Sequence, residues 1–346
     1  MTLKELSLMT GVSVSTISRV VNKNDTHAAS EEVREKIWKL VHETGYVPNS
    51  FAQDLKRNAA VAQAEKKHSI ACVFARTKDG RSDPFFSQIF HAVEHECIKN
   101  KYDVTGVFSV PDFKEASSSL ALSQSDGVIV MGRYSRSLMQ LIKSSCKNVV
   151  YTGLNSITDP YDQIVCDGYQ AAKAAVKHLY ILGHRNIGYI GEKSSEERYR
   201  GYYDSIQELK LPLCREHIVE TEQSLKGGYQ SGLKILTAMS GSTEYISTPP
   251  TAIFCANDTT AIGVMKAVHE RGVNIPKDIS IISIDNTDLC QYSSPMLTSV
   301  DIPKEELGKF AVKIMIDRIN GGHHLPVKIG IPFTLISRES CALLST

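Results

Sequence analysis

Four polar side chains stand just beyond apolar runs or at a helix start, where together they could bind a molecule rich in hydroxyl groups. Asp83, Asn257 and Asp285 each follow an apolar run. Arg198 stands three residues before Gly201 at the start of a helical stretch. Carboxylate, amide and guanidinium groups supply both hydrogen-bond donors and acceptors, which is what neighbouring hydroxyl groups on a ligand require. These residues form the first candidate site.

A second set of polar side chains, near the N-terminus, could contact DNA. The helix expected over residues 14–22 has one apolar face, made by Ile17, Val20 and Val21. The other faces then carry hydroxyl, amide and guanidinium groups that can reach base edges and phosphates in a major groove. These outward residues are Ser15, Thr16, Ser18, Arg19 and Asn22.

Capping and turn residues place that helix second in a three-helix unit with a helix-turn-helix. Thr2 and Glu5 have the spacing of a capping box, which starts a first helix. Gly11 supplies the positive φ of a tight turn, and Ser13 can cap the helix that follows. A third helix has apolar positions that complete a small core. The expected helices are residues 3–9, 14–22 and 30–44.

Apolar runs alternate with helix-like stretches over the rest of the chain. Repeated β-α units of this kind predict doubly wound parallel sheets, which bind ligands at the carboxyl ends of their strands. The expected strands are residues 70–75, 104–108, 127–131, 149–151, 187–190, 252–255 and 279–284. The expected helices are residues 85–99, 169–182, 196–210, 225–239, 259–271 and 304–320.

Composition limits the class of protein. With 346 residues, 42% hydrophobic and 22% charged, the chain is long enough for several domains of a globular protein, and its net charge of +1 does not by itself suggest DNA. No long apolar stretch or signal peptide is found, so a cytoplasmic protein without membrane contact is expected. The eight cysteines have no CxxC spacing, which favours buried free thiols over disulfides or a metal site. No cofactor is expected.

Three segments carry a family resemblance. Residues 12–22 (VSVSTISRVVN), 45–49 (GYVPN) and 52–55 (AQDL) are ordered and spaced as in the lactose and galactose repressor family of bacterial transcriptional regulators. Later motifs continue the resemblance down to Ser340. It implies a small all-α helix-turn-helix head and an α/β core of two doubly wound parallel-sheet subdomains, like that of periplasmic binding proteins. It also implies a homodimer that binds a double-stranded DNA operator and a small-molecule effector.

The resemblance also implies domain boundaries. The head is expected at residues 1–48, a hinge segment and linker at 49–69, and the effector-binding and dimerisation core at 70–340. The first subdomain is expected at about 70–166 and 292–325, and the second at about 167–291 and 326–340. The Ala-rich linker could extend a helix past Lys56. Because no leucine heptads follow Ser340, a dimer is expected and not a tetramer.

The resemblance assigns DNA contacts to the head and hinge. Val14, Ser15 and Arg19 match base-contacting positions of the family, and Leu55 is expected to act as an apolar wedge in a minor groove. The full set of expected DNA-binding residues is Thr2, Val14, Ser15, Thr16, Ser18, Arg19, Asn22, Tyr46, Asn49, Ala52 and Leu55.

The effector site implied by the resemblance includes the polar residues named first and an aromatic wall. Its expected members are Asp83, Phe86, Arg198, Gln223, Asn257 and Asp285. Many sugar-binding members carry Trp or Phe near the position of Gln223, so this wall is expected to be more polar here.

Each of these residues has a structural alternative. Phe86 could be an ordinary core residue. Arg198 could form a surface pair with Glu196 or Glu197. Asp167, Asn257 and Asp285 could instead cap helices or turns. His323 and His324 are expected in a solvated turn and not at a metal.

Catalysis is not expected, because the sequence has no GxSxG, GxxxxGK[ST], HExxH or GxGxxG motif. A transport-type sugar-binding protein would need export, and this sequence carries a DNA-binding head instead. The prediction is a sequence-specific DNA-binding repressor controlled by a sugar bound between the core subdomains. Galactosides are the first compounds to test, because residues 261–278 are similar to regulators of galactoside metabolism. A carbon-catabolite-type regulator controlled mainly by a protein corepressor is the alternative.

Overall fold

The computed structural model describes residues 3–23, 27–44, 68–76, 82–109, 122–239 and 249–344. The chain forms two compact units, Met1–Lys66 and Lys67–Thr346. The expected hinge segment, except for its last two residues, lies outside the described residues. So do five of the predicted DNA contacts: Thr2, Tyr46, Asn49, Ala52 and Leu55. For Asn22 the structure describes only the backbone.

The first unit is a three-helix fold built of α1 (Leu3–Thr10), α2 (Val14–Lys23) and α3 (Glu31–Thr44). Leu6 of α1 and Ile17 of α2 are both 0% exposed in its core. Gly11 has φ +70° in the turn between these helices, which confirms the predicted turn. The Ser13 hydroxyl accepts a hydrogen bond from the Thr16 backbone N–H at 3.2 Å, so it caps α2 as predicted.

The second unit contains two sheets, each of six strands within the described ranges. The first sheet has the order β11-β5-β4-β3-β1-β2, and its neighbouring strands are parallel. Its strands are β1 (His68–Phe74), β2 (Tyr102–Ser109), β3 (Gly127–Met131), β4 (Val149–Gly153), β5 (Asp162–Cys166) and β11 (Lys328–Ile331). The second sheet has the order β12-β10-β9-β8-β6-β7, with an antiparallel pair at β10 and β12. Its strands are β6 (Ile187–Gly191), β7 (Ile218–Glu220), β8 (Ala252–Cys255), β9 (Ser280–Asp285), β10 (Thr298–Asp301) and β12 (Thr334–Ile336).

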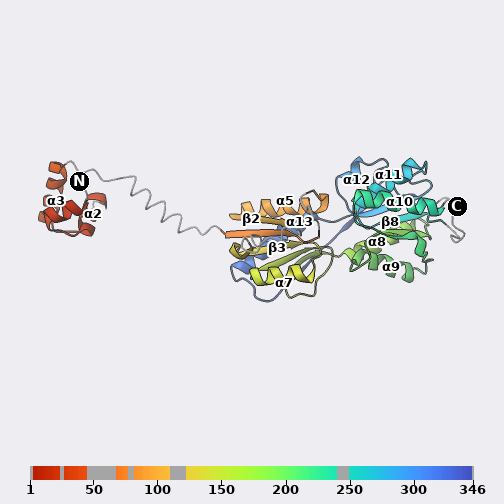
Figure 1. Ribbon diagram of the computed structural model, residues 1–346, viewed down its shortest axis with the longest axis horizontal. Coiled ribbons are helices and arrows are strands. Elements are labelled where there is room, and N and C mark those ends of the chain that lie inside the picture. Colours follow the sequence, from red (N-terminus) through yellow and green to blue (C-terminus); the bar gives the residue numbers. More distant parts are fainter. Residues whose placement is uncertain are drawn as a thin grey trace. The chain divides into compact units, whose positions relative to one another are not determined.

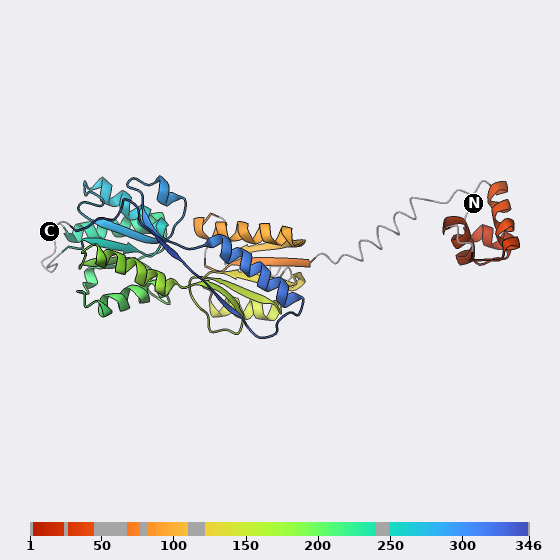
Figure 2. The ribbon, with the colours of Figure 1, turned by 180° about the vertical axis from the view of Figure 1, so that it is seen from behind.

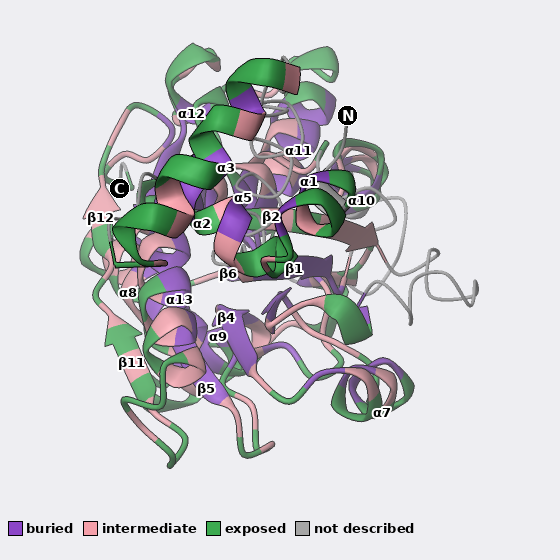
Figure 3. Ribbon diagram, turned by 90° about the vertical axis from the view of Figure 1, so that its left-hand side faces the viewer, coloured by how far each residue is buried: buried purple, intermediate pink, exposed green. Residues whose placement is uncertain are grey.

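Helices cover both faces of each sheet, and each sheet with its helices forms one subdomain. In the first subdomain, α5 (Pro84–Lys99) and α13 (Lys304–Ile319) pack on one face and α7 (Arg136–Ser145) on the other (Figure 1). In the second subdomain, α8 (Gly168–Ile181) and α9 (Glu197–Glu208) lie opposite α10 (Leu225–Met239) and α11 (Asp258–Glu270). A 3₁₀ turn (Arg215–His217) and α12 (Leu289–Tyr292) are also present. Figure 3 shows β4 and β5 as buried, whereas residues of the edge strand β11 are exposed or half-buried.

The chain passes between the two sheets three times (Figure 2). The first crossing follows Cys166 at the end of β5. The chain returns after Asp301 and not near Tyr292, because β10 pairs with β9 of the second sheet. The last crossing follows Ile331 and not Pro326, because β11 pairs with β5 of the first sheet. The elements of the first subdomain therefore lie within 68–166 and 304–331, and those of the second within 168–301 and 334–336.

The packing of α13 against α5 depends on a glycine. A Cβ atom at Gly308 would stand 2.5 Å from the Ile89 carbonyl oxygen and 2.7 Å from the Ala92 Cβ. Both distances are shorter than van der Waals contact, and the carbonyl oxygen belongs to a backbone that cannot rotate away. The two helices therefore approach closely only because residue 308 has no side chain.

We predict that Gly308→Ala lowers the free energy of unfolding by about 1–3 kcal/mol, because the added carbon atom forces α13 and α5 apart. In an open helix interior the same change would raise stability by roughly 1 kcal/mol, so the sign of the effect is informative. Gly330→Ala is the matched control, since a Cβ atom there meets nothing within 4 Å. Urea denaturation of both variants measures the effect. A stabilised Gly308→Ala variant would show that the helices have room for a side chain.

Candidate functional site

A cavity of about 790 Å³ lies between the two subdomains, at the carboxyl ends of the strands. Doubly wound sheets bind their ligands at this end. The structure brings the six residues predicted for effector binding together at this cavity. They are Asp83 and Phe86 from the start of α5, Arg198 from α9, Gln223, Asn257 before α11, and Asp285 at the end of β9.

Asp83 and Asn257 line the cavity and also cap the helices that follow them. Asp83 Oδ1 accepts hydrogen bonds from two backbone N–H groups in the first turn of α5, at 2.9 and 3.1 Å. Asn257 Oδ1 accepts one from the Thr260 N–H at 3.0 Å. The cap and the cavity position are therefore compatible. Asp167 caps α8 but does not line the cavity.

Arg198 is buried and bonded to its neighbours. Its guanidinium group donates to both carboxylate oxygens of Glu196, at 2.8 and 3.0 Å, and to the Ala256 carbonyl oxygen at 2.8 Å. The expected alternative of a surface pair is therefore corrected, because the two side chains are only 4% and 0% exposed. Gln223 accepts a further hydrogen bond from Arg198 at 3.0 Å, so this polar side chain is bonded to the ion pair.

Glu196 keeps its charge in this buried place. Burial by itself would raise the pKa of its carboxyl group, but the Arg198, Arg133 and Arg76 guanidinium groups outweigh burial and lower the pKa to about 2. The carboxylate is therefore ionised at neutral pH.

Asp285 lines the cavity with a buried carboxyl group that lacks a full set of partners. It is 3% exposed, and its Oδ1 atom has no hydrogen-bond partner among the described residues. Burial and the nearby Asp258 carboxylate raise the pKa of Asp285 well above its ordinary value. Its φ of +120° costs a residue with a side chain about 1–3 kcal/mol. Strain and missing hydrogen bonds at one residue are typical of a binding position.

Phe86 belongs to the core and to the cavity wall. It is 6% exposed and packs edge-on against Phe85, with ring centroids 5.1 Å apart. A Cβ atom at Gly132 would stand 2.6 Å from the Phe86 ring, so this glycine leaves the space that the ring fills. The two interpretations of Phe86, core residue and aromatic wall, are both compatible with its place.

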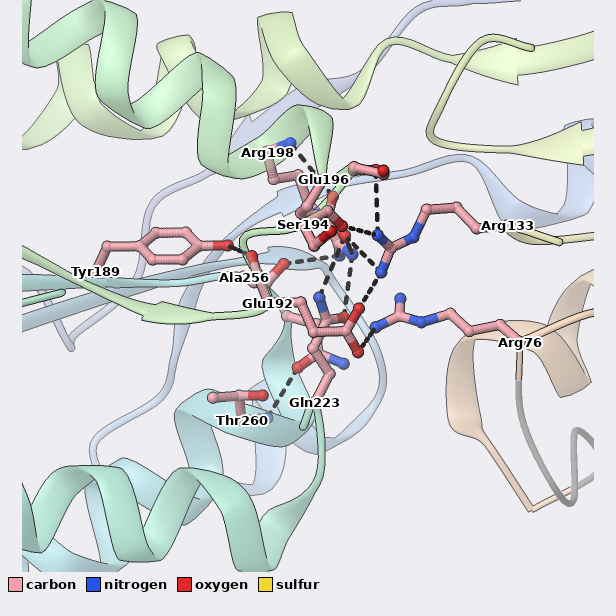
Figure 4. A network of polar contacts seen from close by, with 12 residues as sticks. Arg76, Arg133, Tyr189, Glu192, Ser194, Glu196, Arg198, Gln223, Ala256 and Thr260 are labelled. Atoms are coloured by element: carbon pink, nitrogen blue, oxygen red, sulfur yellow. Dashed lines mark hydrogen bonds and ion pairs between the residues drawn. The ribbon is translucent and has the colours of Figure 1, made fainter. Parts of the chain in front are cut away.

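A cluster of charged side chains, of which only Glu196 and Arg198 were expected from the sequence, joins the two subdomains beside the cavity (Figure 4). From the first subdomain, Arg76 contacts Glu192 at 2.7 Å, and Arg133 pairs with the other carboxylate oxygen of Glu192. Arg133 also lies 3.3 Å from Glu196. Both glutamates belong to the second subdomain. The cleft ion cluster, as we call it, comprises Arg76, Arg133, Glu192, Glu196 and Arg198.

Three residues of this cluster could have been found from the sequence, because each lies one or two residues after a strand. Arg76 is the second residue after β1, Arg133 the second after β3, and Glu192 the first after β6. The sequence does not mark their charges as buried, and exposed ion pairs contribute little. Their proximity to the cavity depends on how the two sheets face each other.

The predicted DNA-contacting face of α2 lies at the surface of the first unit. Val14, Ser15 and Arg19 are exposed, and Thr16 and Ser18 are half-buried. The Ser15 and Thr16 hydroxyl groups lie 2.9 and 2.8 Å from the hydroxyl of the serine that caps the helix. These side chains are available at the start of α2, and their contacts with bases stay a prediction.

Other residues with potential chemistry have structural partners. The eight cysteines are free; six are buried, and Cys214 and Cys341 are half-buried. His323 and His324 follow the turn at Gly321 and Gly322; His324 is exposed, and half-buried His323 lies 2.6 Å from Asp317 and 3.1 Å from Asp162. Within the described ranges, no cluster of three or more His, Cys, Asp or Glu side chains is placed to hold a metal ion. No helix there has the length and apolar character needed to cross a membrane.

Comparison with known proteins identifies the family. Residues 2–49 match bacterial regulatory proteins of the lacI family, and residues 176–341 match a periplasmic binding protein-like domain. The ribose operon repressor of Haemophilus influenzae is 31% identical over 351 residues, which cover 98% of each chain. The chain belongs to the lacI family. As a member of this family it is a DNA-binding transcriptional regulator and not an enzyme.

Two solved structures share the fold of this lacI-family chain. A complex of the transcriptional regulator CelR with cellobiose has a TM-score of 0.71 at 20% identity and covers 98% of this chain and 99% of its own. The lac repressor dimer bound to operator and the anti-inducer ONPF has a TM-score of 0.69 at 23% identity, covering 100% and 99%. These likenesses confirm the predicted fold class of a helix-turn-helix head with a two-subdomain α/β core.

We predict that Arg133→Gln lowers the free energy of unfolding by about 1–3 kcal/mol, because it leaves the buried Glu196 carboxylate with fewer partners. Arg136→Gln is the control, since Arg136 is exposed on α7 and its replacement should change stability by less than about 0.5 kcal/mol. Urea denaturation of both variants provides the measurement. Equal effects of the two substitutions would show that the cleft ion cluster does not stabilise the second unit.

Proposed function

We propose that this lacI-family regulator is a homodimeric repressor whose affinity for its operator is controlled by an uncharged sugar bound in the cavity between the subdomains. Buried polar atoms without hydrogen-bond partners around the cavity carry the proposal. They are Asp285 Oδ1, Asn155 Oδ1, Tyr151 Oη and Arg133 Nε. Each such atom costs about 1–3 kcal/mol while it stays unbonded, so a ligand with several hydroxyl groups would gain by binding there.

The charges around the cavity favour an uncharged ligand. The guanidinium groups of Arg76, Arg133 and Arg198 are already paired with Glu192 or Glu196. An anionic ligand would have to break these pairs. The unbonded oxygens, in contrast, need hydrogen-bond donors, and a sugar hydroxyl supplies one without bringing charge. The ring of Phe86 offers an apolar face beside them.

Two of the similar proteins support a sugar without specifying which one. One relative is a ribose operon repressor, and one structural neighbour holds cellobiose. The resemblance of residues 261–278 to regulators of galactoside metabolism makes a galactoside our first choice. A solved dimer with operator among the structural neighbours supports the proposed homodimer.

We further propose that the exposed start of α2 contacts base edges in the operator. Val14, Ser15 and Arg19 stand there on the face opposite the core. An exposed guanidinium group beside a hydroxyl and a methyl-bearing side chain can distinguish base pairs in a major groove. The other proposed contacts are Thr2, Thr16, Ser18, Asn22, Tyr46, Asn49, Ala52 and Leu55.

Exchanging the two side chains at positions 14 and 15 (Val14→Ser with Ser15→Val) should change which operator is preferred, with each lost base contact costing about 1–3 kcal/mol. Selection from randomised DNA sites measures the ranking. Lys39→Gln, an exposed change on α3, is the control and should weaken binding to all sites alike. An unchanged ranking for the exchanged variant would exclude these positions from sequence recognition.

Sugar binding predicts a thermal shift. Methyl β-D-galactopyranoside, D-ribose and cellobiose are added to the purified chain, and a sugar at 100 times its Kd should stabilise it by about 2.7 kcal/mol. Asp285→Asn should weaken that sugar's binding roughly tenfold, because the amide offers one acceptor oxygen where the carboxyl group offers two. Without sugar the same variant should be more stable by about 1 kcal/mol at neutral pH, since an amide avoids the cost of burial that raises the pKa of the Asp285 carboxyl group.

The operator selected for the wild type is then used to test whether the sugar regulates DNA binding. The active sugar and the operator must change each other's affinity by the same factor. Absence of a thermal shift with any of the sugars, or a sugar that binds but leaves operator affinity unchanged, would overturn the proposed function.

A further inference from the structure

The ammonium group of Lys304 stands in a buried site made of three backbone carbonyl groups, with the Asp301 carboxylate 3.9 Å away. Lys304 is the first residue of α13, and its side chain is 7% exposed. Its Nζ atom donates to the Ile302 carbonyl at 3.1 Å, to the Asn286 carbonyl at 3.3 Å and to the Asp285 carbonyl. An ammonium group has three N–H donors, so these oxygens can satisfy all of them.

Two of the carbonyl groups belong to residues in a strained conformation. Asp285 has φ +120° and Asn286 has φ +49°, and residues with side chains keep such angles only where their surroundings hold them. Asn286 is held by the Ser299 hydroxyl, which accepts from its N–H at 3.1 Å, and by the Asp301 carboxylate, which accepts from its side chain at 2.9 Å. Asp285 has no comparable side-chain restraint on Oδ1. The hydrogen bond from Lys304 restrains its backbone instead.

This contact reaches from one subdomain to the other. The helix α13 packs against α5 and against β3, β4 and β5 of the first subdomain. Asp285 ends β9 of the second subdomain and lines the cavity. Lys304 does not line that cavity. An effect of Lys304 on a bound molecule is therefore indirect, and Asp285 is the cavity residue to which Lys304 is bonded.

We infer that Lys304 is a positioning residue for the sugar site: by binding three carbonyl oxygens, it holds the backbone of Asp285 and Asn286 in the conformation that presents the Asp285 carboxyl group to the cavity. The inference rests on the proposed function, because the property that it predicts is affinity for a sugar. It assigns to the first subdomain a direct effect on a binding residue of the second.

The test is sugar affinity, measured calorimetrically with whichever of methyl β-D-galactopyranoside, D-ribose and cellobiose shifts the wild-type melting temperature. Lys304→Met preserves the shape of the side chain without its charge or donors, and should bind that sugar roughly tenfold more weakly. Lys309→Met is the matched control on the same helix, because Lys309 pairs with Glu305 and Glu306. Its affinity should stay within about twofold of wild type.

A double-mutant cycle separates positioning from a general loss of structure. In an Asp285→Asn background, Lys304→Met should weaken sugar binding by less than about threefold further, since the carboxyl group that it positions is already replaced. Equal losses in both backgrounds would overturn the inference.

Hydrogen exchange without sugar tests the same contact. The Asn286 and Thr287 N–H groups donate to Ser299 Oγ at 3.1 Å and Asp258 Oδ2 at 2.6 Å. They should exchange roughly tenfold faster in Lys304→Met, while the rest of the core keeps its wild-type rates. Unchanged exchange at these two positions, or acceleration throughout the core, would overturn the inference.

A replacement variant and the hydrogen-exchange measurement decide the role of Lys304 even if Lys304→Met does not fold or no sugar binds. Should Lys304→Met not fold, Lys304→Gln replaces it, because an amide reaches fewer of the three carbonyl oxygens; the same local acceleration is expected, and wild-type exchange rates would overturn the inference. If no sugar binds the wild type, the proposed function fails, while hydrogen exchange still decides whether Lys304 holds the backbone of Asp285.

Discussion

The space between the two subdomains is organised around one buried charge, the carboxylate of Glu196. This group has no exposed surface, so it stays ionised only because Arg198 and Arg133 lie against it. Arg198 binds it within the second subdomain, whereas Arg133 reaches it from the first. Withdrawing either guanidinium group from a carboxylate that water cannot reach is costly. The relative position of the subdomains and the electrostatic stability of one side chain are therefore linked.

The cavity residues differ in how far the sequence reveals them. Asp83 and Asn257 could be predicted because each follows an apolar run and starts a helix, and both signals are local. Local signals do not predict the pairing of Arg133 with Glu192, because it depends on how two separate sheets face each other. Asp285 was predictable as a residue at the end of a strand, but its positive φ and unbonded oxygen were not. These properties arise from tertiary packing, and they are the ones that point most directly to binding.

The fold shows the same division between local and non-local information. Residues 127–131, 252–255 and 225–239 have their predicted bounds because each is a long or clearly bounded apolar pattern. The strands β10 and β11 have four residues each and contain Thr, Ser, Lys or Gly, so no periodicity separates them from loops. For this reason the second and third crossings between the subdomains were expected too early in the chain. Strand pairing, which decides the subdomain to which a short strand belongs, is not contained in its own residues.

The three connections between the subdomains are only one or two residues long. Asp167 alone separates β5 from α8, Ile302 and Pro303 separate β10 from α13, and Pro332 and Phe333 separate β11 from β12. Proline fixes φ in two of these connections. Connections this short leave little chain with which the two sheets could slide or separate, whereas rotation at a few joint residues is the usual form of hinge motion between domains. A molecule bound in the cavity touches both sheets, so these short joints connect its contacts with one subdomain directly to the position of the other.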